Sequence, residues 1–109
     1  MADNSFKEFV LDQLARLGQL TCRAMFGGHG IYHQDVFFAI VYEGRLYFKT
    51  TPATRPSYEK EGMMAFRPSA KQTLKNYFEV PPHLLDSADE LIPWARQAVA
   101  VSSCAKKVQ

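Results

Sequence analysis

The clearest hydrophobic pattern in the chain is the run Val36–Tyr42, in which every residue is apolar or aromatic. A strand with one wet face alternates apolar and polar residues, so this run predicts a central strand that is buried on both faces. After a turn at Glu43-Gly44, the segment Arg45–Lys49 does alternate, with Leu46 and Phe48 on one parity. The two segments together predict a β-hairpin in the middle of a sheet.

Helices are predicted at the start and in the middle of the chain. Ser5 and Glu8 have the spacing of a capping box, and apolar residues then recur at helical spacing from Phe6 until Gly18. A second, short helix is expected from Thr54-Arg55-Pro56 to Gly62, because proline is tolerated in a first helical turn and glycine is favoured just past the end.

A third helix is expected at the end of the chain. Ser87 and Glu90 form another capping box, and Leu91, Trp94 and the following apolar residues lie on one face. Pro93 cannot donate the backbone hydrogen bond that an interior helical position requires. A kink or a broken first turn is therefore predicted at Pro93.

The remaining apolar segments predict further strands at Leu20–Met25, Ile31–His33, Met63–Arg67 and Leu74–Val80, the last stopped by Pro81-Pro82. The order of elements is that of an α+β fold with two layers. We expect an antiparallel sheet of about five to six strands, with helices at the start, middle and end of the chain.

Length and composition narrow the class of protein. The 109 residues suit one domain, which we assign to residues 1–104 with a frayed tail at 105–109. The formal net charge of +2 is far below that of proteins that bind nucleic acid over their whole surface, so any such role requires a local patch. Cys22 and Cys104 are distant and lack CxxC spacing, which favours two reduced thiols. Neither a signal peptide nor a membrane span is recognisable.

Three of the six glycines fall within four positions, at Gly27, Gly28 and Gly30. A phosphate-binding loop would need a following helix and further motif residues, whereas Ile31-Tyr32-His33 reads as a strand. We therefore interpret the cluster as a tight crossing or bulge between two strands, in which a valine in place of Gly28 would destabilise the fold.

Catalytic and metal-binding chemistry is not expected. His29 and His33 would share one side of an unbroken strand, with Cys22 or Asp35 as further ligands, but Gly30 is expected to break the register. Neither cysteine has a histidine base nearby in the sequence, and Cys22 alternates with apolar neighbours as a small buried residue does. The sequence predicts no enzyme, no cofactor and no small-molecule substrate.

The strands after the glycine cluster provide the candidate interaction surface. If Leu46, Phe48 and Phe78 face the core together with Met64, Phe66 and Leu74, the opposite face collects cations interleaved with tyrosines. This candidate surface consists of Arg45, Tyr47, Lys49, Arg67, Lys75 and Tyr77.

Three uses of that face are open from the residues alone. It can simply face water, with tyrosine and cation side chains pairing across strands, or bind a protein partner, or grip single-stranded nucleic acid. If helices cover one face only, Phe37 and Val41 would add an apolar patch suited to a homodimer or a regulatory partner. Alternatively the sheet curls, or a helix covers that face as well.

Family resemblance adds to this interpretation. The stretch Arg23-Ala24-Met25-Phe26-Gly27-Gly28-His29-Gly30-Ile31-Tyr32, followed by the aromatic strands and Trp94-Ala95, resembles the N-terminal domain of the TfoX/Sxy family from about Phe9 to Ala98. Its motif residues here, taken as mainly structural, are Arg23, Met25, Phe26, Gly27, Gly28, Gly30 and Tyr32.

The resemblance implies a bacterial cytoplasmic protein with a two-layer α/β fold. In the founding members this domain is associated with transcriptional control of competence, alongside the cyclic-AMP receptor protein. Those regulators carry a second, C-terminal helical domain, whereas this chain is expected to represent the N-terminal domain standing alone, so the competence role transfers weakly. We expect a non-enzymatic domain acting in transcriptional regulation through protein contacts with a regulator or a second copy, with direct nucleic-acid binding as the alternative.

Overall fold

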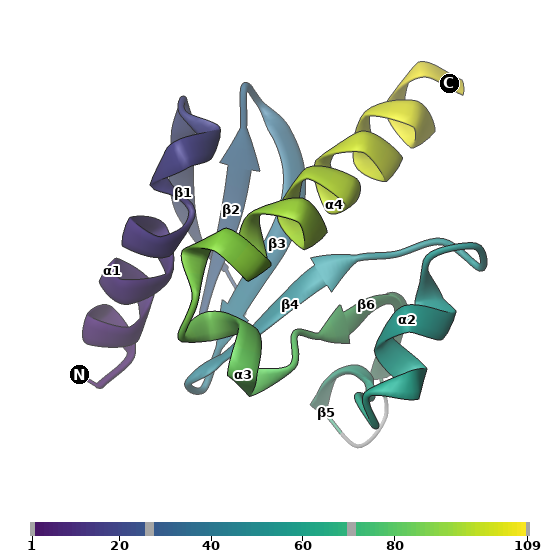
Figure 1. Ribbon diagram of the computed structural model, residues 1–109, viewed down its shortest axis with the longest axis horizontal. Coiled ribbons are helices and arrows are strands. Elements are labelled where there is room, and N and C mark those ends of the chain that lie inside the picture. Colours follow the sequence, from purple (N-terminus) through teal and green to yellow (C-terminus); the bar gives the residue numbers. More distant parts are fainter. Residues whose placement is uncertain (1, 26–27, 70–71, 109) are drawn as a thin grey trace.

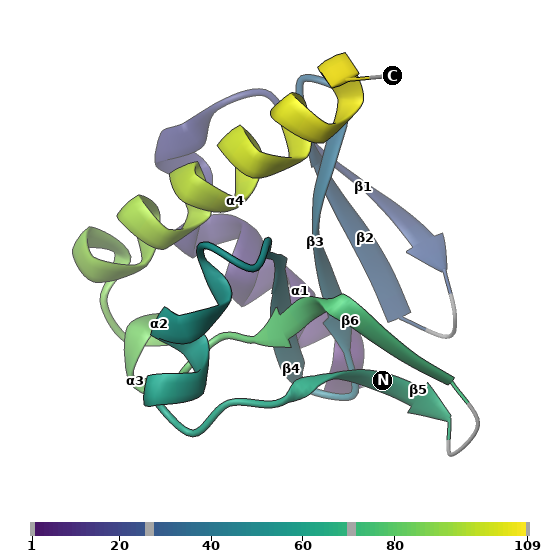
Figure 2. The same ribbon diagram turned by 90° about the vertical axis from the view of Figure 1, so that its right-hand side faces the viewer.

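The structure, a computed structural model, describes residues 2–25, 28–69 and 72–108. Six strands form one fully antiparallel sheet in the order β1-β2-β3-β4-β6-β5. Figures 1 and 2 show the helices gathered on one side of this sheet, so the predicted two-layer α+β class is confirmed. The strands are β1 (Leu20–Met25), β2 (Gly28–His33), β3 (Val36–Tyr42), β4 (Arg45–Lys49), β5 (Ala65–Ser69) and β6 (Gln72–Glu79).

Tight hairpins connect β2 to β3 and β3 to β4. Gln34 and Asp35 have φ of 49° and 69°, and Glu43 and Gly44 have φ of 48° and 74°. Two successive left-handed residues are the geometry of the two-residue turn that matches the twist of antiparallel strands. The Glu43-Gly44 turn lies where the sequence analysis predicted it, and the Gln34-Asp35 turn lies between two of the predicted strands.

The helical elements are α1 (Ala2–Gln13), a 3-10 turn η1 (Ala15–Leu17), α2 (Arg55–Lys60), α3 (Pro82–Leu85) and α4 (Ala88–Val108). The predicted middle helix is confirmed, and Gly62 follows it at φ 80°. The prediction that Ser5 caps the first helix is wrong, because α1 begins at Ala2 and contains Ser5. Pro81-Pro82, predicted only as the end of a strand, also begins the short α3, because proline fits the first turn of a helix.

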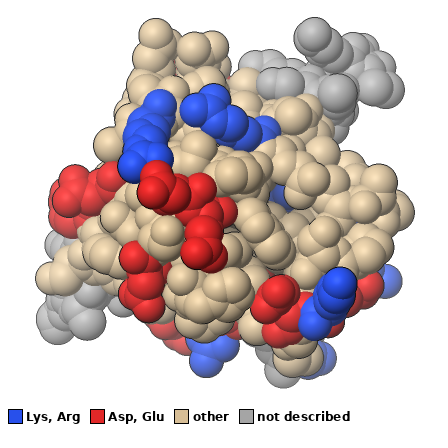
Figure 3. All heavy atoms as spheres, in the orientation of Figure 1, with Lys and Arg blue, Asp and Glu red and all other residues tan. Residues whose placement is uncertain are grey.

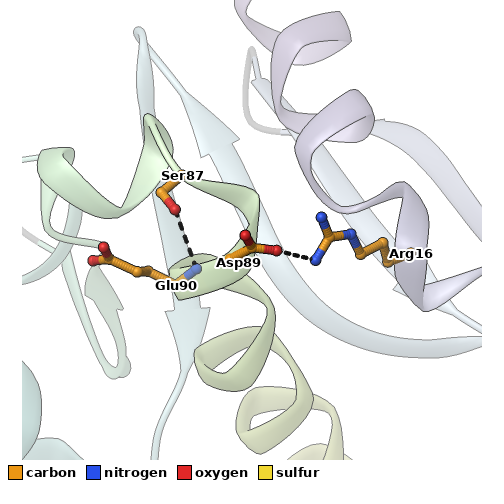
Figure 4. Close-up of polar contacts among 4 residues, drawn as sticks. All are labelled: Arg16, Ser87, Asp89 and Glu90. Carbon is orange, nitrogen blue, oxygen red and sulfur yellow. Dashed lines mark hydrogen bonds and ion pairs between the residues drawn. The ribbon is translucent and has the colours of Figure 1, made fainter.

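The start of α4 agrees with the sequence. The Ser87 side-chain oxygen accepts a hydrogen bond from the Glu90 backbone N–H at 3.4 Å, as Figure 4 shows. The kink predicted as one outcome at Pro93 stays a prediction, and the other outcome, a broken first turn, is wrong, because α4 continues through this exposed residue to Val108. That helix includes the backbone of the predicted tail from residue 105 to residue 108.

The main core lies between the helices and one face of the sheet. Val10 and Leu14 from α1 and Leu91, Ala95 and Ala98 from α4 are fully or almost fully buried against it. The sheet residues of this core are Ile31, Phe38, Ala39, Val41, Leu46, Phe48 and Phe78. Since Val41 belongs to this core, the prediction that it faces outward with Phe37 is wrong.

Two side-chain contacts hold η1 and α1 against the C-terminal helices. Arg16 forms an ion pair with Asp89 in the first turn of α4 (Figure 4), and the Gln13 amide donates to the Leu85 carbonyl at 2.6 Å. Arg16 and Asp89 are both largely exposed, so this ion pair orients the elements more than it stabilises them.

Candidate functional site

The helix-free face of the sheet carries a second, smaller core. Ile40, Tyr47, Phe66 and Tyr77 are buried there, and Phe37, Tyr42 and Leu74 pack against them while partly exposed. We call these seven residues the aromatic cluster. Its side chains come from β3, β4, β5 and β6, so it spans more than half of the sheet.

The cluster exists because the sheet curls. β3 and β5 are three strands apart in the sheet order, which in a flat sheet is about 14 Å. Even so, the Phe66 ring on β5 lies 5.3 Å from the Tyr42 ring on β3 and 4.6 Å from the Tyr47 ring on β4. The β5–β6 hairpin therefore bends toward β3 and encloses the rings, which is the curled alternative that the sequence left open.

Irregular pairing between β5 and β6 makes this bend possible. Ala65 pairs with Phe78 but the next residue, Phe66, pairs with Leu74, so the register shifts sharply between them. Phe66 and Leu74 were predicted to face the main core, and this prediction is wrong. Both side chains lie on the helix-free face, in the aromatic cluster. Met64 is also wrong as a core residue, since it precedes β5 and is 72% exposed.

The structure brings four of the six predicted surface residues together. Arg45 forms an ion pair with Glu79 at 3.1 Å, Lys49 lies over the Tyr77 ring at 5.4 Å, and Tyr47 and Tyr77 form the floor of the cluster. Arg67 and Lys75 are exposed on the β5–β6 hairpin, and no ion pair is seen for either within the described residues.

Burial changes what the two tyrosines can do. Each is only 8% exposed, and burial raises the pKa of Tyr47, with the nearby Glu79 adding to the effect. Burial, together with the nearby Tyr32, raises the pKa of Tyr77 to about 12. Both rings are therefore neutral structural side chains and are not free to stack on a ligand.

The glycine-rich stretch adjoins the cluster through β2. A Cβ on Gly28 would lie 2.2 Å from the Val41 carbonyl oxygen and 3.2 Å from Tyr42, so only glycine fits at this crossing of β2 and β3. Gly30 is buried and pairs with Arg23 and Ile40 on its two sides. The expected close approach of two strands is thus confirmed at Gly28, while Phe26 and Gly27 lie outside the described residues.

Two further motif residues extend the helix-free face toward β1. The exposed Arg23 lies over the half-buried Tyr32 ring at 5.3 Å, and Tyr32 stacks on Phe37 at 5.1 Å. Strand pairing and alternation put Arg23, Tyr32, Arg45, Lys49 and Glu79 on this one face. The family motif predicted a structural role for Arg23 and Tyr32. Their position beside the predicted surface follows from the pairing of β1 with β2, which the sequence does not specify.

The two faces differ in charge. On the helix-free face, strand alternation places the cations Arg23, Arg45 and Lys49 near the anion Glu79. Glu43, in the turn before β4, is a second anion close enough to act on Tyr47. Figure 3 shows the helix-covered side, where both signs occur and acidic side chains gather over the start of α4. Asp89 and Glu90 are the acidic residues of that first turn. Cations thus outnumber anions among these described residues of the helix-free face.

Chemistry-bearing residues elsewhere are dispersed. His29 and His33 lie in one continuous strand, β2, whose register with β3 shifts between Ile31 and Tyr32, one residue past the break expected at Gly30. Four residues of strand separate the two histidines by about 13 Å. No group of three histidine, cysteine or acidic side chains close enough to hold a metal occurs among the residues that the structure describes. Burial raises the pKa of the half-buried Cys22 thiol, which is therefore protonated near neutral pH.

The sequence is similar to those of known proteins. Residues 12–102 match the family model described as the TfoX N-terminal domain. The chain belongs to the TfoX N-terminal domain family. A curated relative, DNA transformation protein TfoX1 from Aliivibrio fischeri, is 36% identical over 76 residues, which are 68% of this chain and 36% of that protein. The chain thus matches about a third of the length of this relative.

Within this TfoX N-terminal domain, the part of the chain that the structure describes has no helix long and apolar enough to cross a membrane.

Proposed function

We propose that this protein is a non-enzymatic interaction domain of the bacterial cytoplasm that acts in transcriptional control of DNA transformation by contacting another protein. The family and the name of the relative support a link to transformation. The helix-free face, with the aromatic cluster as its floor and Arg23 and Lys49 at its margins, is the proposed contact surface.

One observation favours a protein over a nucleic acid as partner: the burial of Tyr47 and Tyr77. A single-strand binder offers aromatic faces on which bases stack, and these two rings are covered by their neighbours in the cluster. A partly apolar surface with a charged margin is typical of protein interfaces.

The absence of an enzymatic role is supported by the dispersal of reactive groups. Cys22 is protonated at neutral pH, and His33 is held by the Leu17 carbonyl, which lies 3.1 Å from its Nε2 atom. A nucleophilic site would bring a thiolate or hydroxyl within hydrogen-bond reach of a base.

The partner class can be tested by photo-crosslinking in cells of the native host. A photoreactive amino acid at position 49 should give a covalent adduct with a protein, insensitive to nuclease. The matched control is position 97, where the exposed Gln97 lies on α4 on the helix-covered side and should give no such adduct. Adducts of equal yield from both positions would contradict the proposed surface.

The regulatory role is tested in the same cells by measuring transcripts of DNA-uptake genes. Lys49→Glu should lower these transcripts as deletion of the gene does, while the protein level stays unchanged. Unchanged transcripts in the deletion strain would overturn the transcriptional role, whatever the crosslinking result.

Direct nucleic-acid binding is the second candidate, favoured by the exposed cations Arg45, Arg67 and Lys75. It requires binding of single-stranded DNA that is strong at low salt and weakens steeply as salt rises. A nuclease-sensitive adduct from position 49 would replace the first proposal with this one.

A further inference from the structure

The outer edge of β1 offers backbone groups for pairing. β1 ends the sheet and pairs with β2 through a regular six-residue register, from Leu20 opposite His33 to Met25 opposite Gly28. Among the described residues no strand pairs with its other side, and α1 lies alongside it on the helix-covered face (Figure 1). Thr21, Arg23 and Ala24 are exposed there. An uncovered edge of this kind can accept another strand.

The opposite edge of the sheet is poorly suited to the same role. β5 contains Pro68, which has no backbone N–H to donate, and its register with β6 shifts twice. Proline and irregular pairing are devices that keep edge strands from recruiting further strands. β1 contains neither proline nor glycine, so the two edges are unequal.

Charge decides what can pair with β1. Arg23 is the single charged residue of this strand and lies on the helix-free face. Lys7 and Glu8, the charged groups that act on Cys22 from α1, form an ion pair with each other at 3.3 Å and largely cancel. The strand edge therefore presents one exposed positive charge.

A second copy of this chain is a poor occupant. Residues that pair between antiparallel strands share a face, so two β1 strands can overlap almost fully in two registers. With residues 21–25 overlapping, Arg23 lies directly opposite its own copy, and with residues 20–24 overlapping it lies diagonally across from it on the same face. Like charges at these positions repel. A strand with a carboxylate beside Arg23 would be attracted instead.

We propose, building on the function above, that β1 binds an extended segment of the protein partner as an added strand, and that Arg23 selects segments with acidic residues on the helix-free face. Because side chains alternate, the segment's other residues would lie on the helix side beside the half-buried Leu20 and Cys22, where apolar groups fit. The partner motif is thus an alternation of apolar and acidic residues.

The test uses two blocked heptapeptides, one alternating valine with glutamate and the other valine with lysine. With isotope-labelled protein, the glutamate peptide should slow hydrogen exchange at amides of residues 20–24 and bind about tenfold more tightly than the lysine peptide. Arg23→Glu should reverse this preference, and Arg23→Gln should abolish it. Arg67→Glu, which changes an exposed arginine on β5, is the matched control and should preserve it.

Several results would overturn the proposal. These are absence of binding at about millimolar peptide, a preference that Arg23→Glu leaves intact, and protection of the same amides by protein dimerisation or by oligothymidylate. If the peptide experiment fails but position 49 still gives a protein adduct, strand addition at β1 is rejected and the proposed function is retained. If position 49 gives no protein adduct either, both strand addition and the proposed function are rejected.

Discussion

At the scale of single residues, Gly28 lies where no side chain fits. Its backbone approaches β3 so closely that a methyl group would lie 2.2 Å from the Val41 carbonyl oxygen. Its requirement for glycine comes from this contact and not from a left-handed backbone, in contrast to Gly62 at φ 80°.

We expect Gly28→Ala to lower the free energy of unfolding by about 3 kcal/mol, and Gly28→Val by more, because β2 and β3 must move apart. Gly62→Ala is the control, with open space around its Cβ and a cost of about 1 kcal/mol from the backbone alone. Urea denaturation measures both. A stable Gly28→Val protein that has merely lost partner binding would restore the ligand-loop interpretation of this stretch.

Tyr77 links a single residue to pH dependence. Its pKa is raised from 10.0 to about 12, so the unfolded chain loses the phenolic proton first. The stabilisation due to the neutral ring is complete below pH 10 and is lost as the pH rises from 10 to 12.

Over that interval, the free energy of unfolding should fall less steeply in Tyr77→Phe than in the parent protein, by on the order of 1 kcal/mol per pH unit. Tyr47 and Tyr58 titrate in both proteins, so the difference isolates Tyr77. Urea denaturation at a series of pH values provides the measurement, and parallel pH profiles would contradict the burial of this ring.

At the scale of elements, the predictions that agree with the structure are those that depend only on residues close together in the sequence. The hairpin turns at Gln34-Asp35 and Glu43-Gly44 and the Ser87 cap depend on neighbours in the chain, and all were predictable. Ser5 has the same spacing to Glu8 as Ser87 has to Glu90 and still lies inside its helix, so spacing alone does not locate a helix start.

The two contacts in Figure 4 should contribute differently to the free energy of unfolding. Ser87→Ala removes the acceptor for the Glu90 N–H and should cost about 1 kcal/mol of unfolding free energy. Arg16→Ala removes an exposed ion pair and should cost less than about 0.5 kcal/mol. Thermal denaturation of the two variants checks the order, and the reverse order would contradict the capping role.

At the scale of the whole molecule, the curl of the sheet is what the sequence could not provide. The parity rule placed Phe66 and Leu74 with Leu46, but the register shift between β5 and β6 turns them to the other face. Such a shift depends on contacts between Phe66 and rings on β3 and β4, far away in the chain. The candidate surface was accordingly found only in part, through its residues in β4 and through Tyr77.

Phe66→Ala should therefore cost about 3 kcal/mol or more, because the buried ring joins β5 to β3 and β4. Met64→Ala, two residues away and 72% exposed, should change stability by less than about 0.5 kcal/mol. Guanidinium denaturation would show the contrast, and equal small effects would mean that the hairpin does not close over the cluster.

β3 contributes to both cores, with Val41 packed under the helices and Ile40 in the aromatic cluster. Its four middle residues, 38–41, are buried between the helix layer and the aromatic cluster. Its amides should thus be among the slowest in the molecule to exchange for deuterium, at rates that report global unfolding. Loss of either core alone would leave this strand protected by the other, so β3 is the part of the domain that holds its two halves in one cooperative unit.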